Sequence, residues 1–179
     1  MIEKEIIETF TLDINEIFSL CIDNNDEMIK GIKEVVIYNQ GSWNNNIKKD
    51  IITIRLNDIP KEIPENLVKM VMNEDGTITN KIKIRLIERT ENNIKLKIKV
   101  KPIANIFFKI NNLLKLSSTK ALITINQIND KAIINAKYKI QVLFVNEKNN
   151  DVIEKYMENI LNSLFINNMI DYLRRIEQK

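Results

Sequence analysis

The sequence has no histidine, one cysteine, three glycines and three prolines among its 179 residues. Histidine is the commonest general base and the commonest metal ligand, so its absence argues against most acid–base enzymes and zinc sites. Glycines stand only at positions 31, 41 and 76, which rules out the glycine-rich phosphate-binding loops. We therefore expect no catalytic residue, no metal site and no cofactor, and we expect the protein not to be an enzyme.

Disulfides and membrane spans are also missing. Cys21 has no partner for an internal disulfide, which favours a reducing compartment, and its place on an apolar stripe favours a small core residue over a reactive thiol. Glu3, Lys4 and Glu5 interrupt any early apolar run, and no stretch approaches the roughly 18 apolar residues of a membrane helix. With 44% hydrophobic residues and a net charge of +3, residues 1–179 are expected to form one soluble, cytoplasmic domain.

The C-terminal stretch, Asp151 to Lys179, has the spacing of a long helix, roughly 40 Å at 1.5 Å per residue. Asp151 and Glu154 have the spacing of a capping pair, which predicts the helix start. The first apolar stripe consists of Ile153, Tyr156, Met157, Ile160, Leu161 and Leu164. Glu154 and Glu158 are expected on the opposite, solvated side.

That apolar stripe changes direction after Leu164. The later apolar residues are Phe165, Met169, Tyr172, Leu173 and Ile176. They define a face rotated by about 100° from the first. The helix is expected either to bend near Asn167 and Asn168 or to be covered from more than one side in its second half.

The N-terminal third predicts a strand followed by two short helices. Residues Glu5 to Leu12 alternate as in a strand, and Asp13 then has the position of a helix cap. Apolar residues at 14, 17, 18 and 21 give the first helix one buried side. A second helix is expected from Asn25 to Lys30, ending at Gly31 as a left-handed cap.

The middle of the chain changes to the two-residue period of strands. Strands are expected in the segments Ile32–Tyr38, Ile52–Leu56, Lys81–Leu86, Ile94–Val100, Leu122–Ile125 and Ile134–Phe144. Asn73–Gly76 and Thr90–Asn93 are typical turns, and Pro102–Ser118 has helical spacing that suggests an inserted helix or lid. The fold class predicted is α+β: a curved antiparallel sheet of about six or seven strands wrapped around a long C-terminal helix.

This order of elements resembles the helix-grip fold of the START-like (SRPBCC) superfamily over nearly the whole chain. A subgroup, the sterol-transferring VASt domains, is similar in the helix with Phe18, in Trp43 at a sheet edge, and in Pro102 followed by Phe107 and Phe108. The resemblance implies a cavity between the concave sheet and the helix. Members of the superfamily use it to carry lipids, sterols or other apolar ligands; some perform cyclase or hydrolase chemistry, and some act only as protein-binding modules.

The expected ligand site lies between sheet and helix. Its sheet wall is predicted to be Leu96, Ile98, Tyr138 and Ile140, its helix wall Tyr156, Ile160 and Leu164, and its outer parts Trp43, Phe107 and Phe108. The same residues could instead fill an ordinary core. Phe107 and Phe108 belong either to a lid that touches an anionic membrane or to a packed helix, and Trp43 is either a membrane-facing tip or a capped edge residue.

The hairpin Lys81–Lys101 is strongly basic, with eight basic residues against Glu88 and Glu91. This charge suits a phosphate-bearing partner, but a solvated outer sheet face explains it too. Nucleic acid is not expected, because the hairpin has no aromatic side chain on which bases could stack. The function expected is binding, transfer or sensing of an apolar ligand, lipid or sterol. The alternative is a protein-interaction module of the same fold with a filled core.

Overall fold

The structure is a computed structural model that describes residues 1–55, 61, 65, 68–69, 72–103, 117–142 and 147–179. Its described strands form one antiparallel sheet of seven strands in the order β1-β7-β6-β5-β4-β3-β2. They are β1 (Ile2–Phe10), β2 (Val35–Asn39), β3 (Ile47–Arg55), β4 (Thr77–Arg89), β5 (Asn93–Pro102), β6 (Ser117–Ile128) and β7 (Lys131–Val142). The predicted curved sheet is thereby confirmed.

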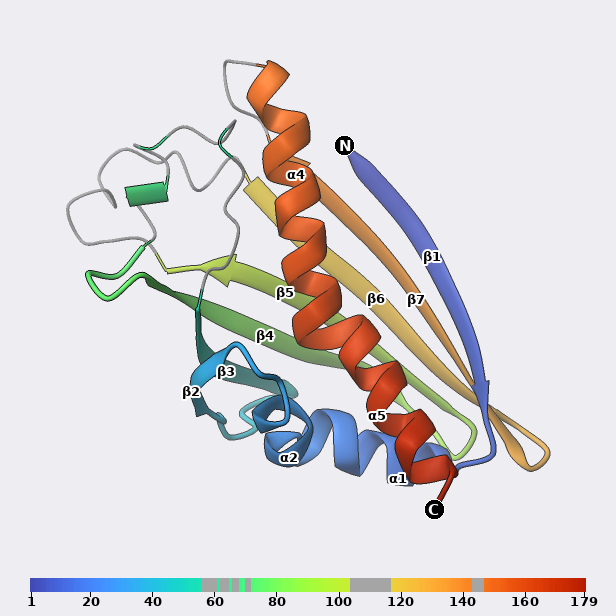
Figure 1. The fold of residues 1–179 in the computed structure, drawn as a ribbon. Coiled ribbons are helices and arrows are strands. Elements are labelled where there is room, and N and C mark those ends of the chain that lie inside the picture. Colours follow the sequence, from blue (N-terminus) through green and yellow to red (C-terminus); the bar gives the residue numbers. More distant parts are fainter. Residues whose placement is uncertain (56–60, 62–64, 66–67, 70–71, 104–116, 143–146) are drawn as a thin grey trace.

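The C-terminal helix lies across one face of this sheet (Figure 1). It is built from α4 (Glu147–Leu161), the π-helical turn η4 (Asn162–Ile166) and α5 (Asn167–Glu177). The short helices α1 (Ile14–Phe18), η1 (Ser19–Asp23) and α2 (Asp26–Lys30) follow β1, as expected, and lie beside the C-terminal end of α5 (Figure 1). The architecture is the α+β helix-grip fold. Among the described residues, no helix combines the length and the hydropathy that crossing a membrane requires.

The hydrophobic core lies between the sheet and the helix. Strand alternation points one set of side chains toward the helix, for example Ile82 and Ile84 on β4, which are both fully buried. The helix contributes Phe165, Ile166 and Met169, which are also fully buried, to the same core cluster. The alternation predicted for the hairpin of β4 and β5 is confirmed.

The π-helical turn explains why the apolar stripe of the helix changes direction. A π-turn adds one residue to a turn, and one residue corresponds to about 100° of rotation. The stripe therefore passes from Leu161 and Leu164 to Met169 and Leu173 while both halves face the core; all four are at most 1% exposed. The break lies at 162–166, just before the predicted asparagine pair.

The predicted helix start was wrong. The described helix begins at Glu147, so Asp151 lies inside it rather than at its cap. Glu154 and Glu158 were expected in solvent, but they are 3% and 2% exposed. Their partners on β1 and β7, given below, explain this burial.

Several N-terminal boundaries also differ. Strand β1 begins at Ile2 rather than Glu5, because all nine of its residues pair with β7. Asp13 caps α1 as predicted: its side chain accepts a hydrogen bond from the Asn15 amide at 2.8 Å. Gly31 is not a left-handed cap, since its φ is −70°. The left-handed glycine is Gly76, with φ +80° in the predicted turn before β4.

The other strand boundaries shift by a few residues. Strand β2 starts three positions later than predicted, and β6 extends the short predicted strand to Ser117–Ile128. Several predictions fall outside the described residues, namely Leu56, positions 104–116 of the predicted lid, and Phe144.

Candidate functional site

The predicted sheet wall lies in the core beneath the helix. Leu96, Ile98 and Ile140 are fully buried, and Tyr138 is 4% exposed. These residues occupy inward positions on β5 and β7, and the structure thus brings the predicted sheet residues together. Their placement suits both interpretations of the sequence, the wall of a ligand site and a filled core.

The predicted helix residues are buried to different extents. Leu164, in η4, is 1% exposed and packs in the core cluster. Tyr156 and Ile160, on α4, are only half-buried. Phe107 and Phe108 lie outside the described residues. Of the predicted helix residues, the one in η4 is thus fully in the core, whereas the two on α4 lie at its margin.

Trp43 has its contacts at the other end of the fold. Its ring stacks on Phe18 with 6.1 Å between ring centroids, and its indole N–H donates to Asp23 Oδ1 at 2.7 Å. The guanidinium of Arg89 lies 4.1 Å from the centroid of the Phe18 ring. These contacts fit the interpretation of Trp43 as a capped edge residue.

Two buried carboxylates fasten α4 to the edge of the sheet. Glu158 accepts hydrogen bonds from the Tyr138 hydroxyl at 3.2 Å, from Lys4 at 3.1 Å and from Lys155 at 2.8 Å. Burial alone would raise the pKa of Glu158, but the hydrogen bonds from the two lysines outweigh it, and the pKa is lowered. This cluster joins α4, β7 and β1.

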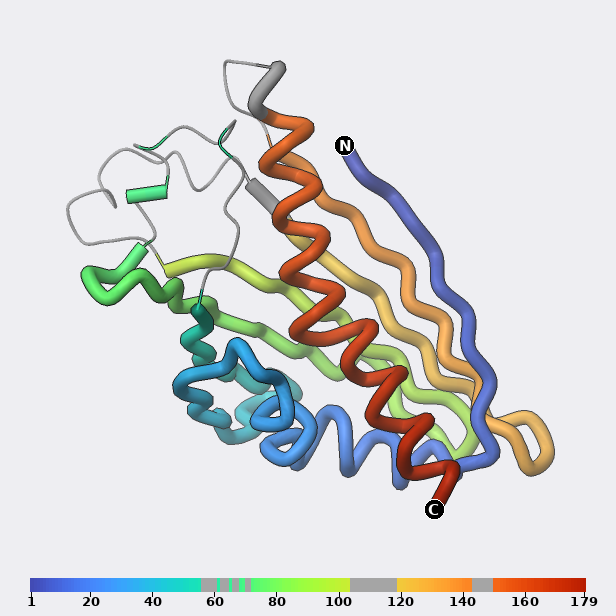
Figure 2. The backbone as a smooth tube through the Cα atoms, viewed as in Figure 1, coloured from blue at the N-terminus to red at the C-terminus, as the bar shows by residue number. Residues whose placement is uncertain are grey.

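Glu154 continues this attachment one turn earlier. It accepts a hydrogen bond from the Val142 amide at 3.0 Å and pairs with the N-terminal amine at 2.6 Å. Val142 ends β7 beyond Ile140, the last residue with a partner on β1, so Glu154 satisfies an amide that has no partner on β1. Figure 2 shows the start of β1 close to α4.

Sequence reasoning missed these two glutamates, although a signal was present. Glu154, Glu158, Leu161 and Phe165 follow one another at spacings of four, three and four residues. Such spacing places all of them on one side of a helix. The stripe that points inward at Leu161 therefore includes both carboxylates.

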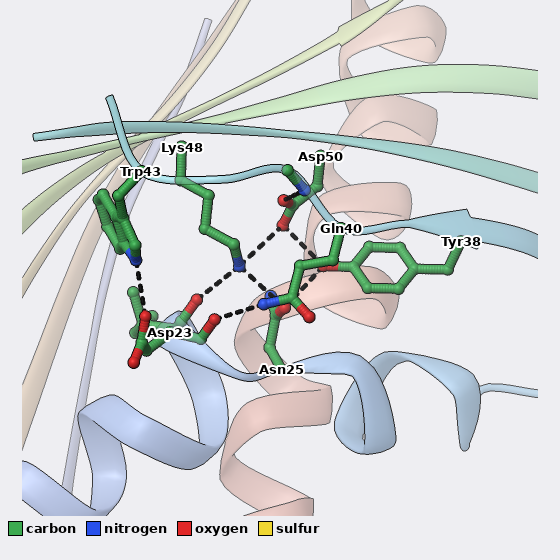
Figure 3. Close-up of polar contacts among 9 residues, drawn as sticks. Asp23, Asn25, Tyr38, Gln40, Trp43, Lys48 and Asp50 are labelled. Carbon is green, nitrogen blue, oxygen red and sulfur yellow. Dashed lines mark hydrogen bonds and ion pairs between the residues drawn. The ribbon is translucent and has the colours of Figure 1, made fainter. Parts of the chain in front are cut away.

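A second buried polar cluster joins β2 and β3 to the short helices (Figure 3). Lys48 lies 3.3 Å from Asp50 and donates to the Ile22 carbonyl at 2.7 Å and to Asn25 Oδ1 at 3.0 Å. Asp50 Oδ2 lies 2.6 Å from the Tyr38 hydroxyl, which donates to it. Burial lowers the pKa of Lys48, and Asp50 offsets part of that effect.

The geometry of this cluster suits a structural role. The Lys48 ammonium has three oxygen partners, as many as it has protons to donate. It is therefore not available as a nucleophile or a general base. The sequence carries a signal here as well, since Lys48 and Asp50 occupy the same alternate positions as the inward-facing Ile52 and Ile54.

No metal centre is evident in the described part of the chain: no group of three or more histidine, cysteine, aspartate or glutamate residues could hold an ion there. Cys21 is fully buried, and burial raises the pKa of its thiol well above the ordinary value. A buried neutral thiol is a poor nucleophile and a poor metal ligand.

No family model matches the sequence, and no curated protein matches it. Solved structures do share its fold. The Zhui aromatase/cyclase from Streptomyces sp. R1128 is 5% identical, with a TM-score of 0.58, covering 97% of this chain and 94% of that one. The protein named Ara h 8.0201 is 11% identical, with a TM-score of 0.53, and the match covers 97% of this chain and 98% of that one.

A third similar structure is the di-domain ARO/CYC StfQ from the steffimycin biosynthetic pathway. It is 9% identical with a TM-score of 0.58, and the match covers 99% of this chain but 51% of StfQ. Identities this low show a shared helix-grip fold and nothing about shared chemistry. The resemblance to START-like proteins is confirmed at the level of the fold.

Proposed function

We propose that this protein binds an apolar small molecule between the inner face of the sheet and α4, as a non-enzymatic cytoplasmic carrier or sensor. A sterol, suggested by the resemblance to VASt domains, is one candidate ligand, and another lipid is the second. Two of the similar structures are named aromatase/cyclases, a name that denotes chemistry on a small organic molecule. That naming supports a small-molecule site in this fold.

The observation that carries the proposal is the unequal closure along the C-terminal helix. From Leu161 to Leu173 its core-facing residues are at most 1% exposed. On α4 before Leu161, by contrast, the buried positions are taken by the carboxylates Glu154 and Glu158. The apolar residues there, Ile153, Tyr156 and Ile160, are only half-buried. Half-buried apolar side chains beside a hydrophobic core offer surface that a ligand can cover, at roughly 25 cal/mol per Å² of apolar area.

The two carboxylates of α4 define the side on which a ligand enters. Glu158 and Glu154 hold α4 against β1 and β7 through Tyr138, Lys4, Val142 and the N-terminal amine. Opening that side would expose unpaired charges and cost several hydrogen bonds. We place ligand entry on the side of α4 away from β1, where the ligand is held by exclusion of water rather than by a chemical step.

A protein-interaction module with a filled core is the second candidate function. The complete burial of Leu96, Ile98 and Ile140 favours it, since a core without space needs no ligand. The partner protein would then bind to the outer surface and not between the sheet and the C-terminal helix. A transient contact with an anionic membrane is compatible with either function.

Native mass spectrometry of the purified protein, with lipid extraction from the same sample, tests the proposal. We expect a species heavier than the 21.0 kDa chain by the mass of one lipid or sterol. The variant Ile160→Trp should fill the site and weaken uptake of a fluorescent fatty acid or sterol by about 10-fold or more, a loss of about 1.4 kcal/mol.

The matched control is Ile128→Trp, because Ile128 is 54% exposed at the end of β6. It should bind the probe like the unchanged protein. A bare chain that takes up no probe would contradict the carrier function and favour the interaction module. Equal losses in the two tryptophan variants would contradict the position of the site.

A further inference from the structure

A row of five lysines crosses the outer face of the sheet. These lysines lie opposite one another on neighbouring strands. Lys49 on β3 is opposite Lys83 on β4, Lys83 is opposite Lys99 on β5, and Lys99 is opposite Lys120 on β6. Lys120 pairs with Lys139 on β7, which pairs in turn with Glu3 on β1. At about 4.8 Å between strands, this lysine row is about 19 Å long.

The row lies on the face of the sheet opposite the C-terminal helix. Its members alternate with inward, buried residues such as Ile84, Ile98 and Ile140. Figure 1 shows the helix covering only the inner face. All five lysines are exposed or half-buried, so their ammonium groups are open to a ligand.

Most of this charge has no acidic partner. Among the described residues, the ion pairs of the row are limited to Lys139 with Glu3, at 3.5 Å. Two further cross-strand pairs of basic residues flank the row on β4 and β5. Arg85 lies opposite Lys97 on one side of the row, and Lys81 lies opposite Lys101 on the other. Within the described residues, the surface is a basic area that is neutralised only near β1, where Glu3 and Glu5 lie beside Lys139 and Lys137.

Such an arrangement is unfavourable in the isolated protein. Like charges directly opposite one another on neighbouring strands destabilise a sheet. The pKa of Lys99 is lowered chiefly by Lys120, then by burial and by further lysines that include Lys83. A multivalent anion would relieve this repulsion, because each phosphate brings negative charge to several ammonium groups at once.

The same surface is hollowed. A depression of about 650 Å³ is lined by Lys97, Lys120, Lys137, Lys139, Glu3 and Glu5. Its volume lies in the range of small-molecule sites, roughly 300–1,000 Å³. Ile87 and Leu122 line it too, and are 50% and 38% exposed.

The composition of the hollow distinguishes between kinds of anion. A bilayer spread over this face would hold phosphates against Glu3 and Glu5 as well as against the lysines. Single-stranded nucleic acid binds through aromatic side chains on which its bases stack, and among the described lining residues the one aromatic, Tyr138, is 4% exposed. A small, multiply charged anion needs no stacking surface, and it can bind Lys97 and Lys120 on β5 and β6, away from the carboxylates of β1.

We propose that the lysine row and the adjoining hollow bind a soluble small molecule that carries two or more phosphate groups. Lys97, Lys99 and Lys120 bind the phosphates as point charges. The other lysines of the row attract the ligand through their positive charge. This phosphate site is on the opposite face of the sheet from the proposed apolar site. A test of the phosphate site therefore does not depend on whether the apolar site exists.

Isothermal titration of the full chain with sodium tripolyphosphate at low salt tests this site. We expect saturable binding that weakens as salt is added, because salt screens exposed charges. The double variant Lys99→Glu, Lys120→Glu should lower the affinity by about 10-fold or more. The neutral variant Lys99→Gln, Lys120→Gln should lower it too, which guards against an effect of the new glutamates.

Lys131→Glu is the matched control. Lys131 is an exposed residue on the outer face of β7, eight positions from Lys139, or roughly 26 Å at about 3.3 Å per residue. Its variant should bind tripolyphosphate within about 2-fold of the unchanged protein. Equal weakening by Lys131→Glu would reveal unspecific attraction and overturn the site.

Two further results would also overturn the proposal. One is the absence of heat with tripolyphosphate for a protein that circular dichroism shows to be folded. The other is binding only to phosphatidylserine vesicles or only to an oligonucleotide, which would assign the basic face to a membrane or to nucleic acid. Circular dichroism of each variant confirms that a lost signal reflects binding rather than unfolding.

Discussion

The ammonium of Lys48 lies 3.3 Å from the carboxylate of Asp50, and these side chains are 1% and 0% exposed. Both point from β3 toward the short helices rather than into solvent. Burying two charges is costly, and the cost is offset only when each finds further partners. Here the partners are Tyr38, Asn25, the Ile22 carbonyl and the Gly41 amide, so one ion pair organises the junction of β2, β3, η1 and α2.

Replacing Lys48 should therefore cost far more than replacing an ordinary surface lysine. Lys48→Met leaves Asp50 buried without its cation, and we expect the free energy of unfolding to fall by about 3–5 kcal/mol in urea denaturation. Lys33→Met, at an exposed position, should change it by less than about 0.5 kcal/mol. A loss below about 1 kcal/mol for Lys48→Met would show that the pair does not organise this junction.

Gly41 is required for a close approach to β3. A Cβ at this position would lie 2.0 Å from the Lys49 carbonyl oxygen, so Gly41→Ala should force the backbone apart and lower stability by more than about 1 kcal/mol. In Gly31→Ala the nearest atom would be 3.5 Å away, and φ is −70°. That variant should be neutral or more stable by up to about 1 kcal/mol. Thermal melts compare the stabilities of Gly41→Ala and Gly31→Ala. Equal changes in melting temperature would contradict the close approach of Gly41 to β3.

Glu158 should contribute to acid unfolding. Its pKa is lowered from the ordinary value of 4.5, since hydrogen bonds from Lys155 and Lys4 outweigh the effect of burial. A carboxylate with a lowered folded pKa stabilises the fold above its unfolded pKa, and this stabilisation is lost as pH falls through the folded pKa.

Glu158→Gln should therefore be less stable than the unchanged protein at pH 7, by roughly 1–3 kcal/mol, and the difference should shrink below about pH 4.5. Denaturant titrations from neutral pH to about pH 3 measure it. Glu16→Gln, at an exposed position on α1, is the control. A constant difference across this range would mean that the ionised form of Glu158 adds nothing to stability.

The lysine row should make stability rise with salt. Added sodium chloride screens the repulsion among its ammonium groups, so the melting temperature should increase between about 10 mM and 300 mM. Lys99→Glu should raise stability at low salt by up to about 1 kcal/mol and weaken the salt dependence. If Lys99→Glu and Lys131→Glu showed the same dependence of melting temperature on salt, repulsion within the lysine row would be contradicted.

Cys21 should report global unfolding. Its side chain is fully buried and burial raises the pKa of the thiol, so alkylation at pH 8 should be slow in the folded protein. In denaturant the thiol should react at the rate of a free cysteine. Rapid alkylation of the folded protein would show that α1 and η1 open without global unfolding.

Much of the fold could be predicted from local patterns. Alternation along β4 and β5 identified the hairpin, because a sheet with one buried face requires apolar residues at every second position. Asp13 marked the start of α1 through its short side chain. The rotated stripe of the C-terminal helix also pointed to the break that η4 makes.

The polar contacts that hold these elements together could not be predicted in the same way. Glu154 was given a capping role from its spacing to Asp151, whereas its partners are the Val142 amide and the N-terminal amine. Met1 is far from Glu154 in the sequence, and only the pairing of β1 with β7 brings them together. A spacing rule describes neighbours along one helix and holds no information on such a contact.

The sequence alone thus determined the fold class, the order of the elements and the absence of histidine chemistry, because all three depend on composition and on periods of two and 3.6 residues. The tertiary structure decided which charges are buried and which are aligned. Lys48 and Lys49 are adjacent and chemically identical, yet one is 1% exposed in a polar cluster and the other begins the lysine row. Strand pleating turns them to opposite faces, and the register of four further strands gives the second its neighbours.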